Sequence, residues 1–127
     1  MPHILVVDDE PEITKLVSKI MESRGHRVSV ARDGEEAIAR VAEDRPDVIV
    51  LDLNLPKLDG VEVCRRIKGD AQTRRIPIVM MTAAYVGVDD AARGFDAGAD
   101  EYIVKPFLRE VLIHNVERLI ADAAAKS

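Results

Sequence analysis

Polar side chains end four of the apolar runs in this chain, and their chemical types belong together. The runs end in carboxylates, a hydroxyl and an amine, carried by Asp8 and Asp9, Asp52, Thr82 and Lys105. A short apolar run bounded by turn signals is typical of a strand that is buried on both faces. Because open α/β sheets hold their ligand sites outside the carboxyl ends of their strands, we expect these side chains to share one site.

This combination of groups suits phosphoryl transfer. Three carboxylates in one pocket repel each other in a low dielectric and require a compensating cation. Carboxylate oxygens without a neighbouring His or Cys favour Mg²⁺ or Mn²⁺ over zinc. Lys105 adds a second positive charge and Thr82 a hydroxyl donor, and phosphoryl transfer depends mainly on such positioning and charge neutralisation. Asp52 would then be the nucleophile, as carboxylates are in aspartyl-phosphate chemistry.

Each residue taken alone has a simpler interpretation. Asp8 and Asp9 would cap the helix that follows them. Asp52 would be a turn residue, and Lys105 would have no special role. Their convergence on one edge of a sheet, with balanced charges, favours the phosphoryl site.

Strand and helix patterns alternate five times along the chain, which predicts a parallel sheet with helices on both faces. The second strand alternates polar and apolar residues and should lie at an edge, whereas the first, third and fourth should be central. The predicted strands cover 3–8, 26–31, 48–52, 78–82 and 102–104. The predicted helices cover 11–24, 35–43, 58–68, 88–95 and 108–123.

Composition restricts the class of protein. The 127 residues fit one domain, 1–127, and 47% of them are hydrophobic, which is enough for a packed core. A net charge of −5 argues against a nucleic-acid-binding domain. The single cysteine, Cys64, excludes an intrachain disulfide, and no apolar run approaches the ~20 residues that span a bilayer. We therefore expect a cytoplasmic protein with no membrane contact.

The chain resembles the receiver domain of two-component response regulators over essentially its whole length, in particular the single-domain type similar to chemotaxis regulators. Any one of the shared motifs is weak evidence, but their order and spacing are specific. The motifs are Val6-Val7-Asp8-Asp9-Glu10, Leu51-Asp52-Leu53-Asn54-Leu55-Pro56, Asp59-Gly60, Met81-Thr82-Ala83, Gly94 with Ala97-Gly98-Ala99-Asp100, and Lys105-Pro106-Phe107. The resemblance implies an α/β, doubly wound, five-stranded parallel sheet of order 2-1-3-4-5 with five helices, the flavodoxin-like topology.

The resemblance also implies roles for the site residues. Asp52 would accept a phosphoryl group from a histidine kinase or a phosphotransfer protein. Lys105 and Thr82 would bind that phosphate, and the peptide bond from Lys105 to Pro106 would be cis. The ligands of Mg²⁺ (or Mn²⁺) would be Asp8, Asp9, Asp52 and the backbone carbonyl of Asn54.

By the same resemblance, Thr82 and Tyr102 would form a switch. Thr82 would close onto a phosphate oxygen while the ring of Tyr102 turns inward. This movement would change the surface formed by the fourth helix, the fifth strand and the last helix, and so control a downstream protein effector. The chain would thus be a phosphoacceptor that assists its own phosphorylation and slow dephosphorylation, and not an enzyme.

Two alternatives use the same topology. Phosphatases similar to haloacid dehalogenases have a D-x-D motif whose second Asp drives turnover, and Asn54 stands at that position here. We expect slow to moderate autodephosphorylation, with Asn54 and Ala84 controlling access for water. A flavodoxin-like cofactor binder is disfavoured because Asp8-Asp9-Glu10 would repel a flavin phosphate.

The sequence says less about the downstream effector through which the domain acts than about the phosphoryl site. Receivers fused to winged-helix DNA-binding domains carry Glu-Leu and an Arg after Lys-Pro-Phe, whereas Val111 and Asn115 stand at those places here. We therefore expect a regulator that acts through protein contacts without binding nucleic acid, and a receiver cut from a larger regulator with a C-terminal effector is the alternative. The wide apolar face of the last helix, which includes Ile113 and Ile120, predicts a partner or homodimer interface.

Overall fold

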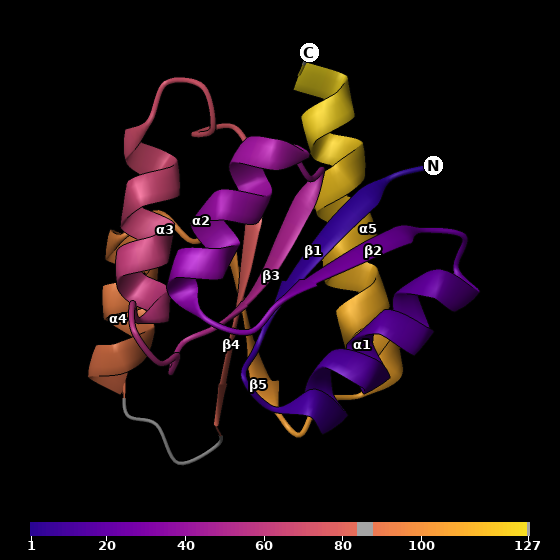
Figure 1. Ribbon diagram of the computed structural model, residues 1–127. Coiled ribbons are helices and arrows are strands. Elements are labelled where there is room, and N and C mark those ends of the chain that lie inside the picture. The colour runs from indigo at the N-terminus through magenta and orange to yellow at the C-terminus, as the bar shows by residue number, and fades with distance from the viewer. Residues whose placement is uncertain (84–87, 127) are drawn as a thin grey trace.

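The computed structural model describes residues 1–83 and 88–126. Its described part contains five strands and five helices that alternate along the chain (Figure 1). The strands are β1 (His3–Val7), β2 (Arg27–Ala31), β3 (Val48–Asp52), β4 (Ile78–Ala83) and β5 (Glu101–Lys105). The helices are α1 (Pro11–Ser23), α2 (Gly34–Glu43), α3 (Gly60–Gly69), α4 (Val88–Asp96) and α5 (Arg109–Lys126).

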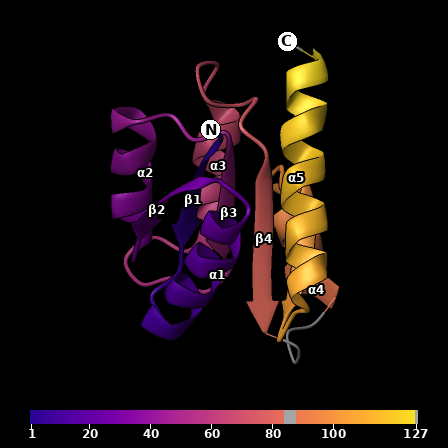
Figure 2. The ribbon, with the colours of Figure 1, turned by 90° about the vertical axis from the view of Figure 1, so that its right-hand side faces the viewer.

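All four pairs of neighbouring strands are parallel, and the sheet order is β2-β1-β3-β4-β5. This order confirms the predicted fold class and places β2 at an edge. Helices α2, α3 and α4 cover one face, and α1 and α5 cover the other (Figure 1). The view turned by 90° shows α5 running beside β4 on the face opposite α2 (Figure 2).

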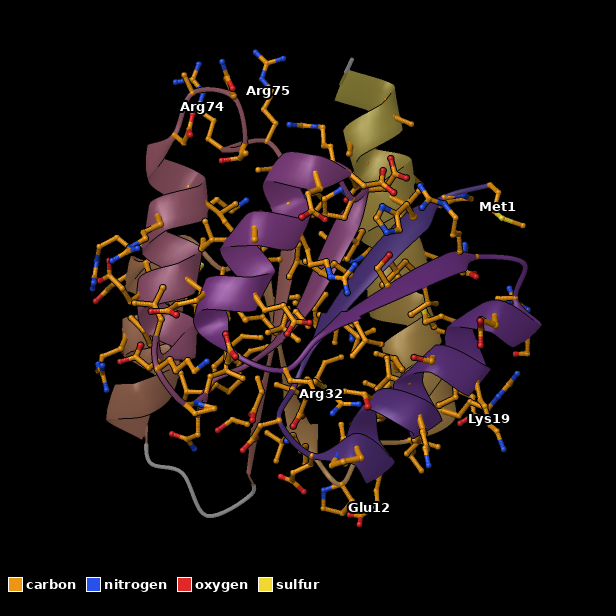
Figure 3. All side chains as sticks on the ribbon, in the orientation of Figure 1. Met1, Glu12, Lys19, Arg32, Arg74 and Arg75 are labelled. Atoms are coloured by element: carbon orange, nitrogen blue, oxygen red, sulfur yellow. The ribbon has the colours of Figure 1, made fainter. Side chains whose placement is uncertain are left out.

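The central strands are buried on both faces, as their continuous apolar runs predict. Alternate side chains of each strand point to opposite faces, so one strand supplies two cores. Leu5 and Leu51 pack with α2 and α3, whereas Ile4 and Val50 pack with α1 and α5. Charged side chains such as Glu12, Lys19, Arg74 and Arg75 extend outward at the periphery instead (Figure 3).

The start of α3 differs from its predicted boundary. The helix begins at Gly60 and not at Leu58, because the Asp59 side chain accepts a hydrogen bond of 2.9 Å from the backbone N–H of Glu62 and so caps the helix. Leu58 belongs to the preceding turn, where Lys57 has a φ of 66°. At the other end of the chain, α5 continues to Lys126, beyond the predicted end at Ala123.

Gly60 brings the start of α3 against the end of β3, next to Asp52. Its N–H donates to the carbonyl oxygen of Leu53 at 3.0 Å. A Cβ at this position would overlap the backbone carbonyl oxygen of Asp52 and approach the Cα of Leu53 to 2.9 Å. The obstacle is backbone, which cannot rotate away, so only glycine permits this approach of helix to strand.

We predict that Gly60→Ala lowers the free energy of unfolding by about 3 kcal/mol, because the new methyl group forces apart two packed backbone segments. Denaturant unfolding followed by circular dichroism measures this change. Gly69→Ala is the matched control, since a Cβ there meets nothing within 4 Å. Equal stabilities of the two variants would contradict the close approach.

Candidate functional site

The carboxyl ends of four neighbouring strands bring the predicted polar residues together. Asp52 is the last residue of β3, Lys105 is the last of β5, and Thr82 lies one residue before the end of β4. Asp8 directly follows β1. Figure 1 shows these strand ends on one side of the molecule. Residues separated by up to 97 positions are thereby joined, since Lys105 Nζ donates to Asp8 Oδ2 at 3.0 Å.

Lys105 lies between the carboxylates. Besides its contact with Asp8, its Nζ is 3.4 Å from Asp52 Oδ1 and 3.8 Å from Glu10 Oε1. Burial lowers the pKa of Lys105, but the hydrogen bond to Asp8 and the charges of Asp52, Asp8 and Glu10 outweigh it and raise the pKa overall. Lys105 is therefore a permanent cation at this site.

Asp8 and Asp52 are both buried, with exposed fractions of 0% and 4%. Burial raises the pKa of Asp52 to about 6, and the negative charge of Asp8 adds to this rise. Lys105 and a backbone hydrogen bond at Asn54 oppose it. One lysine therefore does not fully compensate two buried carboxylates.

The acidic residues fit a hard divalent cation. Asp8, Asp9 and Glu10 each offer a carboxylate oxygen, and these oxygens lie within 4.8 Å of one another. Oxygen ligands of this kind suit Mg²⁺, and the added charge would balance the buried carboxylates. Glu10 was not predicted as a member of this cluster, although it follows Asp8 and Asp9 directly in the sequence.

Two hydroxyl groups near the site are buried without a partner. Among the residues that the structure describes, neither Thr82 Oγ1 nor Tyr102 Oη has a hydrogen bond. An unpaired buried hydroxyl costs about 1–3 kcal/mol, so each such group calls for an explanation. Thr82 is 2% exposed and lies on the strand next to Asp52, where its hydroxyl can donate to an added anion.

Three further predictions concern Pro106, Asn54 and Ala84. The peptide bond from Lys105 to Pro106 is cis, as predicted. Asn54 is exposed and lies two residues beyond the end of β3. Ala84, predicted to influence the access of water, lies outside the described residues.

In the described part of the chain, no helix is long and apolar enough to cross a membrane.

The sequence matches a known family and several of its members. The family model of the response regulator receiver domain matches residues 4–117. The DNA-binding dual master transcriptional regulator RpaA of Synechocystis is 44% identical over 120 residues, which are 94% of this chain and 49% of RpaA. Response regulator MprA of Mycobacterium tuberculosis is 41% identical over 93% of this chain and 50% of MprA. The chain thus spans about half the length of the curated relatives it matches.

Solved structures give the same result. The receiver domain of NtrX from Brucella abortus has a TM-score of 0.86 at 34% identity, covering 93% of this chain and 98% of that one. The receiver domain of the Francisella response regulator 1452 has a TM-score of 0.87 at 30% identity, covering 96% and 98%. A CheY-like receiver domain from Methanospirillum hungatei, at 24% identity and a TM-score of 0.92 over 100% of this chain and 99% of that one, supports the fold alone.

The raised pKa of Asp52 predicts a pH-dependent penalty on stability. The folded state holds this proton up to a pKa of about 6, well above the usual 3.8. Wild-type stability should therefore fall as the pH rises through this interval. Asp52→Asn removes the buried charge and should raise the free energy of unfolding at pH 7.5 by about 2 kcal/mol, with a smaller gain at pH 5.

Denaturant unfolding in the presence of a chelator measures both values. Asp9→Asn is the control, because it removes one negative charge from an exposed neighbour of Asp52. A gain for Asp52→Asn that is the same at both pH values, or no larger than that of Asp9→Asn, would contradict the buried charge.

Proposed function

Because the chain belongs to the response regulator receiver domains of two-component systems, we propose that Asp52 is its phosphoacceptor. Receiver domains are phosphoacceptor signalling domains and not enzymes in the usual sense. The observation that carries the assignment is the pairing of the buried carboxylates of Asp52 and Asp8 with one amine, Lys105. We place this domain over 1–127 and its action in the cytoplasm.

In the proposed reaction, a carboxylate oxygen of Asp52 attacks the phosphorus of a phosphohistidine on a histidine kinase or a phosphotransfer protein. The phosphorus–nitrogen bond breaks, the imidazole leaves with the bonding electrons and takes up a proton, and an acyl phosphate forms on Asp52. Lys105 pairs with the phosphoryl oxygens, and the free hydroxyl of Thr82 donates to one of them. Such fixed donors stabilise the charge that spreads over the transferred group.

The residues for Mg²⁺ (or Mn²⁺) would be Asp8, Asp9, Asp52 and the backbone carbonyl of Asn54. When bound, this ion supplies positive charge that neutralises the phosphoryl oxygens. Asp8 is held toward the site by its ion pair with Lys105. Glu10, which shares the acidic cluster, adds negative charge at the exposed rim.

The product would be a signal and not a catalytic intermediate. A phosphatase of the haloacid dehalogenase type would need a general acid at the position of Asn54, whose amide cannot supply a proton in this way. We therefore propose slow autodephosphorylation. A phosphoryl group that persists allows the Thr82 and Tyr102 switch to act on the surface of α4, β5 and α5.

This surface carries exposed apolar side chains that suit a protein partner or a second copy. The exposed fractions are 48% for Phe95, 48% for Val104, 69% for Leu108 and 41% for Val111. Ile113 and Ile120, named from the sequence, are partly buried and pack against the core cluster that contains residues of α1 and α5. The exposed apolar residues that best suit such an interface are therefore Leu108, which directly precedes α5, and Val111 on α5.

The nature of the effector is a separate question. RpaA is a DNA-binding regulator by name and about twice as long as this chain, which supports the alternative of a receiver within a larger regulator. For the receiver domain itself we propose protein contacts only, consistent with its net charge of −5.

We predict that acetyl phosphate phosphorylates the wild-type chain in the presence of Mg²⁺, and that Asp52→Asn or a chelator abolishes the modification. Intact-mass spectrometry detects the added phosphoryl group, and its decay after removal of acetyl phosphate gives the lifetime. Asp59→Asn is the control, since Asp59 caps α3 on the same side of the molecule and should remain dispensable. Persistence of the modification in Asp52→Asn would overturn the assignment.

We predict that Val111→Asp weakens self-association of the protein treated with beryllofluoride and Mg²⁺ by about tenfold or more, because it places a charge within an apolar contact. Sedimentation velocity measures the dissociation constant. The control is Leu16→Asp, an apolar residue on α1 with a similar exposed fraction of 48%. Equal association of the two variants would show that this surface does not form the dimer.

A further inference from the structure

The ring of Tyr102 packs closely against α4 at Gly94. Gly94 lies on α4 and is buried. A Cβ at this position would lie 3.3 Å from Tyr102 Cε2 and 3.7 Å from Tyr102 Cδ2. It would also lie 3.6 Å from Cε of Met80, the residue of β4 that pairs with Tyr102 in the sheet register. The tyrosine ring thus lies so close to the backbone at 94 that a Cβ there would require it to shift by a few tenths of an ångström.

The backbone of α4 gives no other reason for this glycine. Gly94 is not among the residues with positive φ, so alanine could adopt its conformation. Within a helix, glycine is less favourable than alanine because it loses more backbone freedom on folding. The glycine therefore weakens α4, and the compensating feature in the structure is the close approach of the Tyr102 ring.

Packing holds the ring in this position, because no hydrogen bond of the described residues does. Tyr102 Oη is buried without a partner, so its hydroxyl opposes the inward position. The ring instead contacts Phe95, with centroids 5.8 Å apart and planes inclined by 34°, and joins the core cluster that contains Met80. Gly94, Phe95 and Met80 together form the ring seat.

We propose that Gly94 and Phe95 are positioning residues that set the fraction of molecules with Tyr102 turned inward, and thereby the free energy that phosphorylation must supply to the switch. This inference rests on the proposed function, in which Tyr102 couples Asp52 to the surface of α4, β5 and α5. A methyl group at 94 would crowd both the Tyr102 ring and Cε of Met80, while Phe95 already contacts the ring, so the substitution disfavours the inward position. Loss of the Phe95 ring removes a contact that holds the Tyr102 ring, so it also favours the outward position.

The experiment uses the full chain labelled with 3-fluorotyrosine. The chain has two tyrosines and no tryptophan, so Tyr85→Phe leaves Tyr102 as the only fluorine label. The difference in ¹⁹F shift between H₂O and D₂O reports exposure of the ring. We expect Gly94→Ala to raise the outward-to-inward ratio by about tenfold, an overpacking effect, and to increase this isotope shift.

Controls separate the seat from a general effect on the helix. Gly69→Ala also replaces a helical glycine, but its Cβ meets nothing within 4 Å, so the Tyr102 signal should not change. Phe95→Ala should increase the isotope shift, and Phe95→Leu should restore part of the wild-type value. Gly94→Ala also strengthens α4. The free energy of unfolding of this variant should therefore change less than expected from the outward shift of Tyr102.

A second measurement links the seat to the site. If inward Tyr102 favours the phosphorylated state, Gly94→Ala should weaken the apparent affinity for beryllofluoride with Mg²⁺ by up to about tenfold. An unchanged Tyr102 signal in Gly94→Ala would overturn the seat, whatever the result at Asp52. An exposed Tyr102 with unchanged beryllofluoride affinity would overturn its regulatory role. Absence of phosphorylation in the wild type would instead contradict the proposed function alone.

Discussion

The pairing of buried carboxylates with Lys105 is the constraint on which the rest of this structure depends. Two carboxylates at Asp8 and Asp52 are placed where water cannot solvate them, and one amine lies within 3.0 and 3.4 Å of them. Removing ions from water costs several kcal/mol for each, and one cation compensates only part of this cost. The folded state therefore tolerates an acidic site that gains stability from any added positive charge.

The sheet can hold these buried charges in place because it is rigid and buried on both faces. Asp8 directly follows β1, and Asp52 and Lys105 end β3 and β5, so the register of the sheet fixes where these three side chains begin. The approach of α3 at Gly60 closes the site from one side. Function thus depends on packing several residues away, because the same strands that build the two cores bring the charged groups together.

Much of this could be predicted from the sequence, for reasons that differ between residues. The strand runs before Asp52 and Thr82 are continuous and apolar, which fixes the parallel sheet and its functional edge. The start of α3 was misplaced because the apolar pattern reaches Leu58, whereas the cap at Asp59 decides where hydrogen bonding begins. The exposure of Ile113 depends on the rotation of α5 against the sheet, which periodicity alone does not determine. The seat at Gly94 requires the contact between two elements and has no local signature.

The energetics of the switch follow from its unpaired groups. Satisfying the hydroxyl of Thr82 is worth about 1–3 kcal/mol, and allosteric couplings are typically of the same size. Moving an equilibrium from 1:99 to 99:1 requires about 5.5 kcal/mol, so one hydroxyl cannot drive a complete transition. The remainder must come from the charge imbalance at Asp52 or from a starting equilibrium that is already close to even. A ring that is seated inward with its own hydroxyl unpaired is evidence for the second explanation. In the proposed switch, the inward and outward states of Tyr102 would therefore be close in free energy, and packing contacts on α4 would set how strongly the charge of a phosphoryl group changes the surface.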